Sequence, residues 1–178
     1  MKYILKVICI LSVSVLFCGC EKWMAEHLGR EIMSFRNNAD YTVSIYSAMI
    51  TPNRSPIYPD TTLPYSASRI IDIAPRDDKV VYSSPTGGSI LEVYESYNTD
   101  TISFFVFSTE SLSTLGWDSA RTSYLILQRY DIGFHDLFLV PQGPTFPPTE
   151  EMRNIKMWPP YGTYDANGHR IDTTKSAR

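Results

Sequence analysis

Thiol chemistry is confined to the start of the chain, where all three cysteines, Cys9, Cys18 and Cys20, lie within the first 20 residues. If residues 1–19 are a removable leader, Cys20 is the one thiol that the mature chain keeps, and it stands where a lipid is attached as a thioether. The mature domain is then expected to fold without a disulfide. It also has no thiolate for a metal ion or for nucleophilic catalysis.

The leader has the three-part layout of a secretory signal: two lysines, an uncharged apolar run, and small residues before Cys20. The apolar run is shorter than the roughly 20 residues that a membrane-spanning helix needs, which disfavours a retained transmembrane anchor. The four residues FCGC that end at Cys20 resemble the bacterial lipobox, with Phe17 where leucine is usual. They predict a signal peptide over residues 1–19 and an acylated Cys20, whose acyl chains hold the protein on a membrane.

A second group of candidate residues is aromatic. Trp158, Tyr161 and Tyr164 lie close together and alternate with proline and glycine. Flat ring faces on a stiff backbone suit stacking on a sugar or on a proline-rich partner. Packing of the same rings over a sheet edge is the alternative, and the sequence leaves both open.

Other catalytic and metal-binding patterns are weak. The three histidines are scattered, with no second ligand at helical spacing, so no metal or cofactor is expected. The string from Asp165 to Gly168 resembles the start of a calcium loop, but the glutamate that such a loop needs would fall at Thr174. Paired carboxylates for sugar hydrolysis stay open, the candidates being Asp60, Glu92, Glu95, Asp118 and Asp131.

Charge and length narrow the class of protein. The leader contains two of the 16 Lys and Arg residues and none of the 19 Asp and Glu residues, so the mature chain carries 14 basic against 19 acidic residues. This balance argues against nucleic-acid binding. The 159 residues that remain of 178 suit one domain, which we expect over residues 31–178 after a lipid-anchored tether at residues 20–30.

Strand signals dominate the domain. The almost continuous apolar run at residues 102–107 predicts the central strand, because such a run needs both faces covered. The turn residues NNAD at 37–40 predict a β-hairpin between the segments before and after them. Further strands are predicted at residues 68–73, 79–82 and 124–130, and helical turns at 89–97, 109–122 and 149–155.

Proline marks two irregular regions. Four prolines within residues 51–64 predict an exposed loop, because each removes a backbone donor from a sheet. Residues 141–178 form a C-terminal segment rich in proline and aromatic residues. Within it, residues 163–171 are expected to form a small hairpin with Asn-Gly at the turn.

The order of these signals is similar to that of a group of small envelope lipoproteins of Bacteroidetes bacteria. The shared features follow the chain from the lipobox cysteine to the proline-rich segment: FRNN at 35–38, YPDTTLP at 58–64, an aromatic strand, Trp117 in a short helix, LQRYD at 127–131 and TFPP at 145–148. The resemblance implies a Gram-negative envelope lipoprotein. It brings no catalytic residues to carry over.

The fold expected is therefore mainly β, at the border of α+β: an antiparallel two-layer sheet or sandwich with two or three short helices. Two classes of function stay open for a protein anchored by lipid in the cell envelope, at the outer membrane. One is a non-enzymatic accessory protein that binds a protein or glycan, and the other is a hydrolase of envelope glycans. An enzyme should bring two carboxylates, or His135 or His169 with a carboxylate, into one concave site.

Overall fold

The computed structural model of the chain describes residues 32–48, 63, 70–83, 89–96 and 101–171. The predicted leader, Cys20 and the tether lie outside these residues, as does nearly all of the predicted loop at 51–64. Within the described residues, no helix combines the length and apolar character needed to span a membrane.

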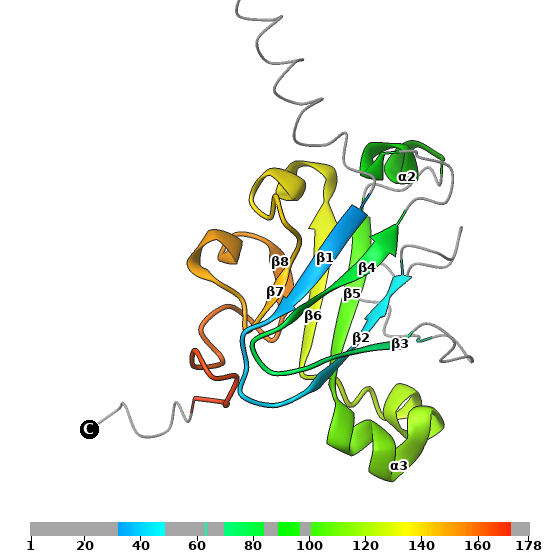
Figure 1. The fold of residues 1–178 in the computed structure, drawn as a ribbon, viewed down its shortest axis with the longest axis vertical. Coiled ribbons are helices and arrows are strands. Elements are labelled where there is room, and N and C mark those ends of the chain that lie inside the picture. Colours follow the sequence, from blue (N-terminus) through cyan, green and yellow to red (C-terminus); the bar gives the residue numbers. More distant parts are fainter. Residues whose placement is uncertain (1–31, 49–62, 64–69, 84–88, 97–100, 172–178) are drawn as a thin grey trace, which may run out of the picture.

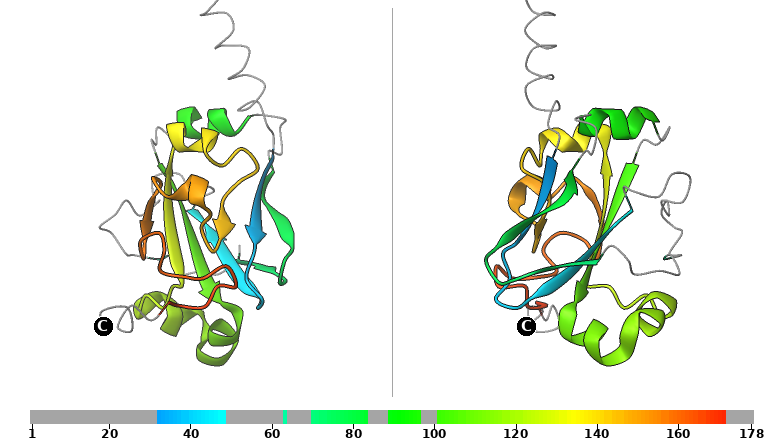
Figure 2. Two further views of the ribbon diagram at one scale, coloured as in Figure 1. Left: turned by 90° about the vertical axis from the view of Figure 1, so that its left-hand side faces the viewer. Right: turned by 45° about the vertical axis from the view of Figure 1, so that its right-hand side comes forward.

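The strands of the described residues form two sheets that face each other (Figure 1, Figure 2). All strand pairs are antiparallel except β1 with β7. This architecture confirms the predicted mainly β, two-layer fold. The strand order of the smaller sheet is β4 (Asp78–Ser83), β1 (Ile32–Asn37), β7 (Thr145–Phe146). The strand order of the larger sheet is β3 (Ile70–Ile73), β2 (Val43–Ser47), β5 (Thr101–Ser108), β6 (Gln128–Gly133), β8 (Lys156–Trp158).

The predicted hairpin between β1 and β2 is wrong. β1 pairs with β4 in the smaller sheet, whereas β2 pairs with β3 and β5 in the larger one. The chain therefore crosses from one layer to the other at residues 38–42, and the partner strands cross back at residues 74–77. We call these two crossing segments the corner. Asn and Asp residues stabilise a change of direction, but which strands then pair is decided by contacts distant in the sequence.

Asn37 holds the two segments of the corner together. Its side chain is fully buried, and its Nδ2 donates hydrogen bonds to the backbone carbonyls of Tyr41 (2.8 Å), Ile73 (3.0 Å) and Ala74 (3.0 Å). Its Oδ1 accepts from the backbone N–H of Ala39 at 2.9 Å. One amide thus satisfies backbone groups on both crossing segments, which a buried turn otherwise leaves without partners.

The main core lies between the two sheets. Phe35 of β1 packs against Phe104 of β5 and Tyr130 of β6, with ring centroids 6.3 and 6.2 Å apart. All three rings are fully buried. β5 occupies the middle of the larger sheet, as its apolar run predicts, because the residues that alternate with Phe104 pack on the opposite face of the sheet.

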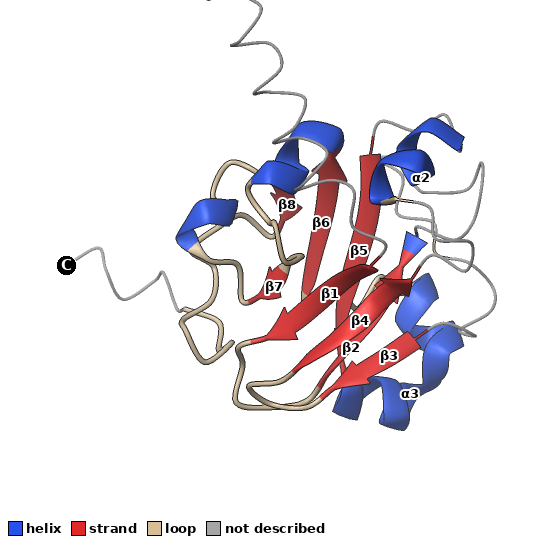
Figure 3. Ribbon diagram, turned by 45° about the horizontal axis from the view of Figure 1, so that its top comes forward, coloured by secondary structure: helices blue, strands red, loops and turns tan. Residues whose placement is uncertain are grey.

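Two helices cap the sheets at opposite ends (Figure 3). At one end lies α2 (Ile90–Ser96), at the same end of the domain as the start of β1 (Figure 1, Figure 2). At the other, α3 (Thr109–Thr122) begins at Ser108, whose side chain accepts a hydrogen bond from the N–H of Ser111. Trp117 of α3 contacts Tyr46 and Phe107, so this helix covers the second apolar face of β5.

The strand expected at residues 124–130 is shifted. Tyr124 has a positive φ of 50°, and β6 begins only at Gln128 and continues to Gly133. Tyr124, Ile126 and Leu127, which precede Gln128, still pack against the two cores, which explains why this stretch resembles a strand in sequence. After β6 the chain forms a short 3-10 helix, Phe134–Phe138.

The C-terminal segment closes the open side between the sheets. β7 pairs with β1, β8 pairs with β6, and the predicted hairpin at residues 163–171 is confirmed by an antiparallel bridge between Tyr164 and Arg170. Gly168 has a φ of 86°, and a Cβ placed there would lie 2.7 Å from the Cβ of Ala39. The hairpin therefore meets the corner at a point where only glycine fits.

We expect alkali to weaken the fold through its buried phenols. Tyr41 donates to the backbone carbonyl of Gly168 at 2.6 Å, and burial raises the pKa of Tyr41 to about 12, above the usual value near 10. Below pH 10 the phenol is protonated in both folded and unfolded chains. Above it, the unfolded chain ionises first, so the free energy of unfolding should fall as the pH rises from about 10 to 12.

Urea melts of the wild type and Tyr41→Phe at pH 8 and at pH 11.5 measure this effect. The variant should lose about 1 kcal/mol at pH 8, where it lacks the hydrogen bond, and should lose less than the wild type on going to pH 11.5. If the free energy of unfolding fell equally in the two proteins between pH 8 and pH 11.5, a role for Tyr41 would be contradicted.

Candidate functional site

A groove of about 410 Å³ lies where the C-terminal segment meets the corner. Ligand sites in proteins generally measure about 300–1,000 Å³. Two of the aromatic residues singled out in the sequence, Tyr161 and Tyr164, line this groove. Its other lining residues come from four segments: Asn38, Arg76, Pro147, Pro148, Thr149, Gly162, Asp165 and Ala166.

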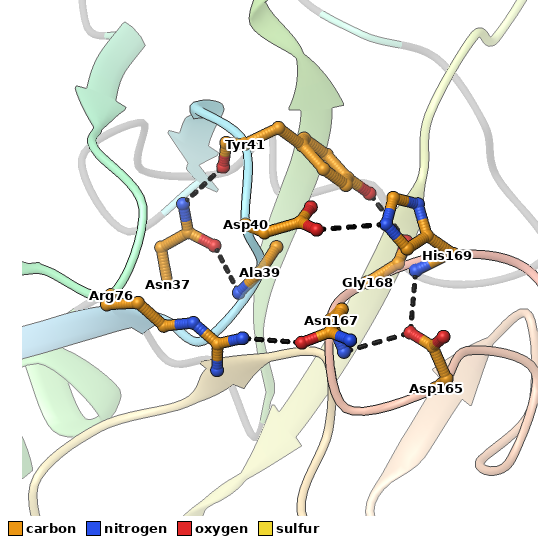
Figure 4. A network of polar contacts seen from close by, with 9 residues as sticks. All are labelled: Asn37, Ala39, Asp40, Tyr41, Arg76, Asp165, Asn167, Gly168 and His169. Atoms are coloured by element: carbon orange, nitrogen blue, oxygen red, sulfur yellow. Dashed lines mark hydrogen bonds and ion pairs between the residues drawn. The ribbon is translucent and has the colours of Figure 1, made fainter.

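Asp165 supplies a negative charge to the groove. Its Oδ1 accepts hydrogen bonds from the backbone N–H groups of His169 (3.0 Å) and Asn167 (2.9 Å), as Figure 4 shows. These bonds, chiefly the one from His169, hold the pKa of Asp165 below its usual range. Asp165 is therefore a carboxylate at neutral pH, and its Oδ2 accepts no hydrogen bond from the described residues.

Arg76 and Asn38 supply hydrogen-bond donors. Arg76 Nη2 donates to Asn167 Oδ1 at 2.5 Å, which holds the guanidinium against the hairpin (Figure 4). The half-buried side-chain amide of Asn38 makes no hydrogen bond with the described part of the chain, while its backbone N–H donates to the carbonyl of Phe146 at 2.6 Å. The groove thus offers donors on Arg76 and Asn38, and acceptors on Asn38 and Asp165.

Tyr161 lines the groove, and its hydroxyl is engaged by a residue that does not line it. The hydroxyl donates to Glu150 Oε2 at 2.8 Å, and the guanidinium of Arg153 lies 5.0 Å from the ring centroid. Arg153 does not line the groove, so it covers the ring from outside. The hydrogen bond to Glu150 raises the pKa of Tyr161, and Arg153 together with Tyr161 lowers the pKa of Glu150.

Tyr164 is half buried. It both packs within the protein and lines the groove, which are the two roles that the sequence left open. Its ring packs at 5.2 Å against Phe146, and its hydroxyl donates to the backbone carbonyl of Leu127 at 2.5 Å. Burial raises its pKa. The ring is therefore fixed by packing while part of it lines the groove.

Trp158 lies apart from these two tyrosines. It sits on β8, is 46% exposed, and contacts Tyr124 with ring centroids 6.0 Å apart. It does not line the groove. The structure thus brings together two of the three predicted stacking residues and places the third at the edge of the larger sheet.

Among the described residues, His135, His169 and the predicted carboxylates do not converge in the groove. His169 Nε2 lies 3.1 Å from Asp40 Oδ2, but the two side chains are 58% and 50% exposed and neither lines the groove. Of the residues that line the groove, only Asp165 is a carboxylate. Elsewhere, His135 contacts Phe134, and Glu92 is exposed on α2. Asp118 pairs with Arg121, and Asp131 is buried with Arg129. Asp60 and the side chain of Glu95 lie outside the described residues.

Arg76, Asn38 and the Pro147-Pro148 pair were not recognised as site residues from the sequence. Each lies in a turn or a proline-rich stretch, and turn signals say where the chain bends without saying which bends meet. The positive φ of Arg76, 59°, has no sequence signal of its own. Within the described part of the chain, no group of three His, Cys, Asp or Glu side chains is placed to hold a metal ion.

The fold is a two-layer β domain, and its groove has a mixed aromatic and polar lining. Comparisons of the chain with family models, with curated proteins and with solved structures found no match. Its function is therefore inferred from its own residues.

Proposed function

We propose that this chain is a lipid-anchored accessory protein of the bacterial cell envelope, held at the outer membrane, that binds a glycan or protein partner in the groove without chemical conversion. The observation that carries the binding role is the groove itself. Two tyrosines line it together with Asn38, Arg76 and Asp165, and these residues come from separate segments.

The anchoring part of the proposal is supported by the leader and Cys20. β1 begins at Ile32, 12 residues after Cys20. At no more than about 3.5 Å per residue, the connecting chain spans at most about 40 Å. A partner of the anchored protein must therefore lie close to the membrane.

Binding is favoured over hydrolysis by the make-up of the groove. Hydrolysis of a glycosidic bond generally uses two carboxyl groups on either side of the bond. The described groove lining supplies Asp165 alone, and backbone N–H groups keep this residue ionised, unlike a general acid. These features support recognition without bond cleavage.

Replacement of Cys20 tests the anchor. In Cys20→Ala the thioether cannot form, so we expect loss of labelling by a palmitate analogue and release of the protein from the membrane fraction. Labelling followed by fractionation measures both. Undiminished membrane retention of a Cys20→Ala chain from which the leader has been cut would contradict the proposed anchor.

Replacement of Tyr161 tests the groove. Tyr161→Ala removes a partly exposed ring, so the fold should persist while retention of solubilised envelope components on the immobilised protein falls about tenfold. Trp158→Ala is the matched control, because it removes an exposed aromatic ring of the same segment that does not line the groove. Equal retention by wild type and Tyr161→Ala would contradict a binding role for the groove. Shortening of retained glycans that depends on Asp165 would instead identify a hydrolase.

A further inference from the structure

We infer that the groove binds the uncharged pyranose rings of an envelope glycan, an inference that rests on the proposed binding function and specifies its ligand. Three properties of the groove carry it: how its tyrosines are oriented, which polar atoms it offers, and how its charges balance.

The tyrosines contribute ring surface to the groove. The hydroxyl of Tyr161 donates to Glu150, and the hydroxyl of Tyr164 donates to the backbone carbonyl of Leu127. Each of these phenolic protons is already engaged within the protein. What the two residues offer a ligand is therefore the ring itself, which suits the C–H face of a sugar.

The polar atoms of the groove require a ligand with both donors and acceptors. Asp165 Oδ2 can only accept a hydrogen bond, the guanidinium of Arg76 can only donate, and the amide of Asn38 does both. Sugar hydroxyls donate and accept, so they match all three groups. A proline-rich peptide offers carbonyl oxygens but no N–H at its prolines, and would leave the carboxylate of Asp165 without a donor.

The charges that line the groove balance each other. Arg76 and Asp165 are the only charged lining residues among those described. Asp165 disfavours an anionic ligand and Arg76 disfavours a cationic one, which leaves an uncharged ligand as the best match.

Titration calorimetry on the full acylated protein, in a micelle of a detergent without a sugar headgroup, tests the inference. The neutral probes are the tetrasaccharides of N-acetylglucosamine (β-1,4), glucose (α-1,4 and β-1,4) and mannose, and the comparison probes are trigalacturonate and decaproline. At least one neutral sugar should bind saturably and more tightly than either comparison probe. Tyr161→Ala should weaken its binding about tenfold.

Two further variants distinguish the contribution of the Tyr161 ring from those of its hydroxyl and of Trp158. Tyr161→Phe keeps the ring and loses only the hydroxyl that bonds to Glu150, so its affinity should stay within about threefold of the wild type. Trp158→Ala should bind as the wild type does. Near-UV circular dichroism verifies that each variant is folded.

The outcomes are distinguishable. Absence of saturable binding by all four neutral sugars, or preference for trigalacturonate, would overturn the inference. Binding of decaproline that is lost in Tyr161→Ala would overturn it while leaving the groove as a binding site for protein. Sugar binding that survives in Tyr161→Ala and is lost in Trp158→Ala would place the sugar elsewhere and overturn the role of the groove as well.

Discussion

Asp131→Ala should lower the free energy of unfolding by about 3–5 kcal/mol, because it deletes one partner of a buried ion pair. Arg129 Nε lies 2.6 Å from Asp131 Oδ1, and the two side chains are only 1% and 4% exposed. Ser103 donates to the same carboxylate oxygen at 2.8 Å. The substitution leaves the guanidinium of Arg129 buried without this carboxylate.

The pKa of Arg129 reflects both its burial and its hydrogen bonds. Burial alone lowers it, but hydrogen bonds with Asp131 and Tyr124 more than offset burial, so its pKa is raised. The guanidinium also lies 5.2 Å from the ring centroid of Phe105. Arg129 is therefore charged in the folded protein and depends on its carboxylate partner.

A variant in which both charges are replaced separates the value of the pair from the cost of breaking it. Arg129→Met with Asp131→Leu replaces both charges by apolar side chains, and should recover most of the stability that Asp131→Ala loses. Asp131→Asn, which keeps the shape and an acceptor oxygen, serves if Asp131→Ala does not fold. Guanidinium chloride melts measure all of these. A loss below about 1 kcal/mol in Asp131→Ala would show that the pair contributes little.

Asn37→Asp should be comparably severe, at about 4 kcal/mol or more. The introduced carboxylate cannot donate to the carbonyls of Tyr41, Ile73 and Ala74, and it directs negative charge at all three. Leaving one buried polar group unsatisfied costs about 1–3 kcal/mol, and here three acceptors lose their donor. Asn38→Asp is the matched control, because the half-buried Asn38 amide bonds to none of the described residues; it should cost less than about 1 kcal/mol.

The effect of Asn37→Asp should depend on pH. The site favours the protonated carboxyl, which regains one donor, so the pKa of the introduced group should be raised in the folded state. The variant is then least destabilised below the unfolded pKa near 4, and stability is lost as the pH rises through the raised folded value. Urea melts at pH 4 and pH 8, compared with Asn38→Asp at the same values, test this. A penalty equal at both pH values would contradict the role assigned to the Asn37 amide.

The sequence predicts the elements of this fold better than their partners. The apolar run of β5 marks the middle of the larger sheet, because six consecutive apolar or small residues need cover on both faces. The polar string from Asn37 to Asp40 predicts a change of direction, and the chain does turn there. That it turns between two sheets is determined by β3 and β4, which follow much later in the sequence.

The sequence likewise predicts some residues of the candidate site but not how they come together. Tyr161 and Tyr164 are recognisable as flat rings on a stiff segment, whereas Trp158, which has the same sequence signal, faces a different surface because it belongs to β8. Arg76 and Asn38 reach the groove only because β1 and β3 both end at the corner. No local pattern reveals that two turns and a C-terminal hairpin will meet.

The direction of β1 gives the proposed anchored protein one end close to the tether and one end distant from it. This strand starts at the same end of the domain as α2, where the preceding chain joins it, and its six residues lead to the corner that carries Asn38. At about 3.3 Å per residue the strand separates the attachment point from the groove by roughly 20 Å. In the proposed anchored protein, the tether and the groove then lie at opposite ends of β1, so a ligand in the groove need not contact the point where the tether enters the domain.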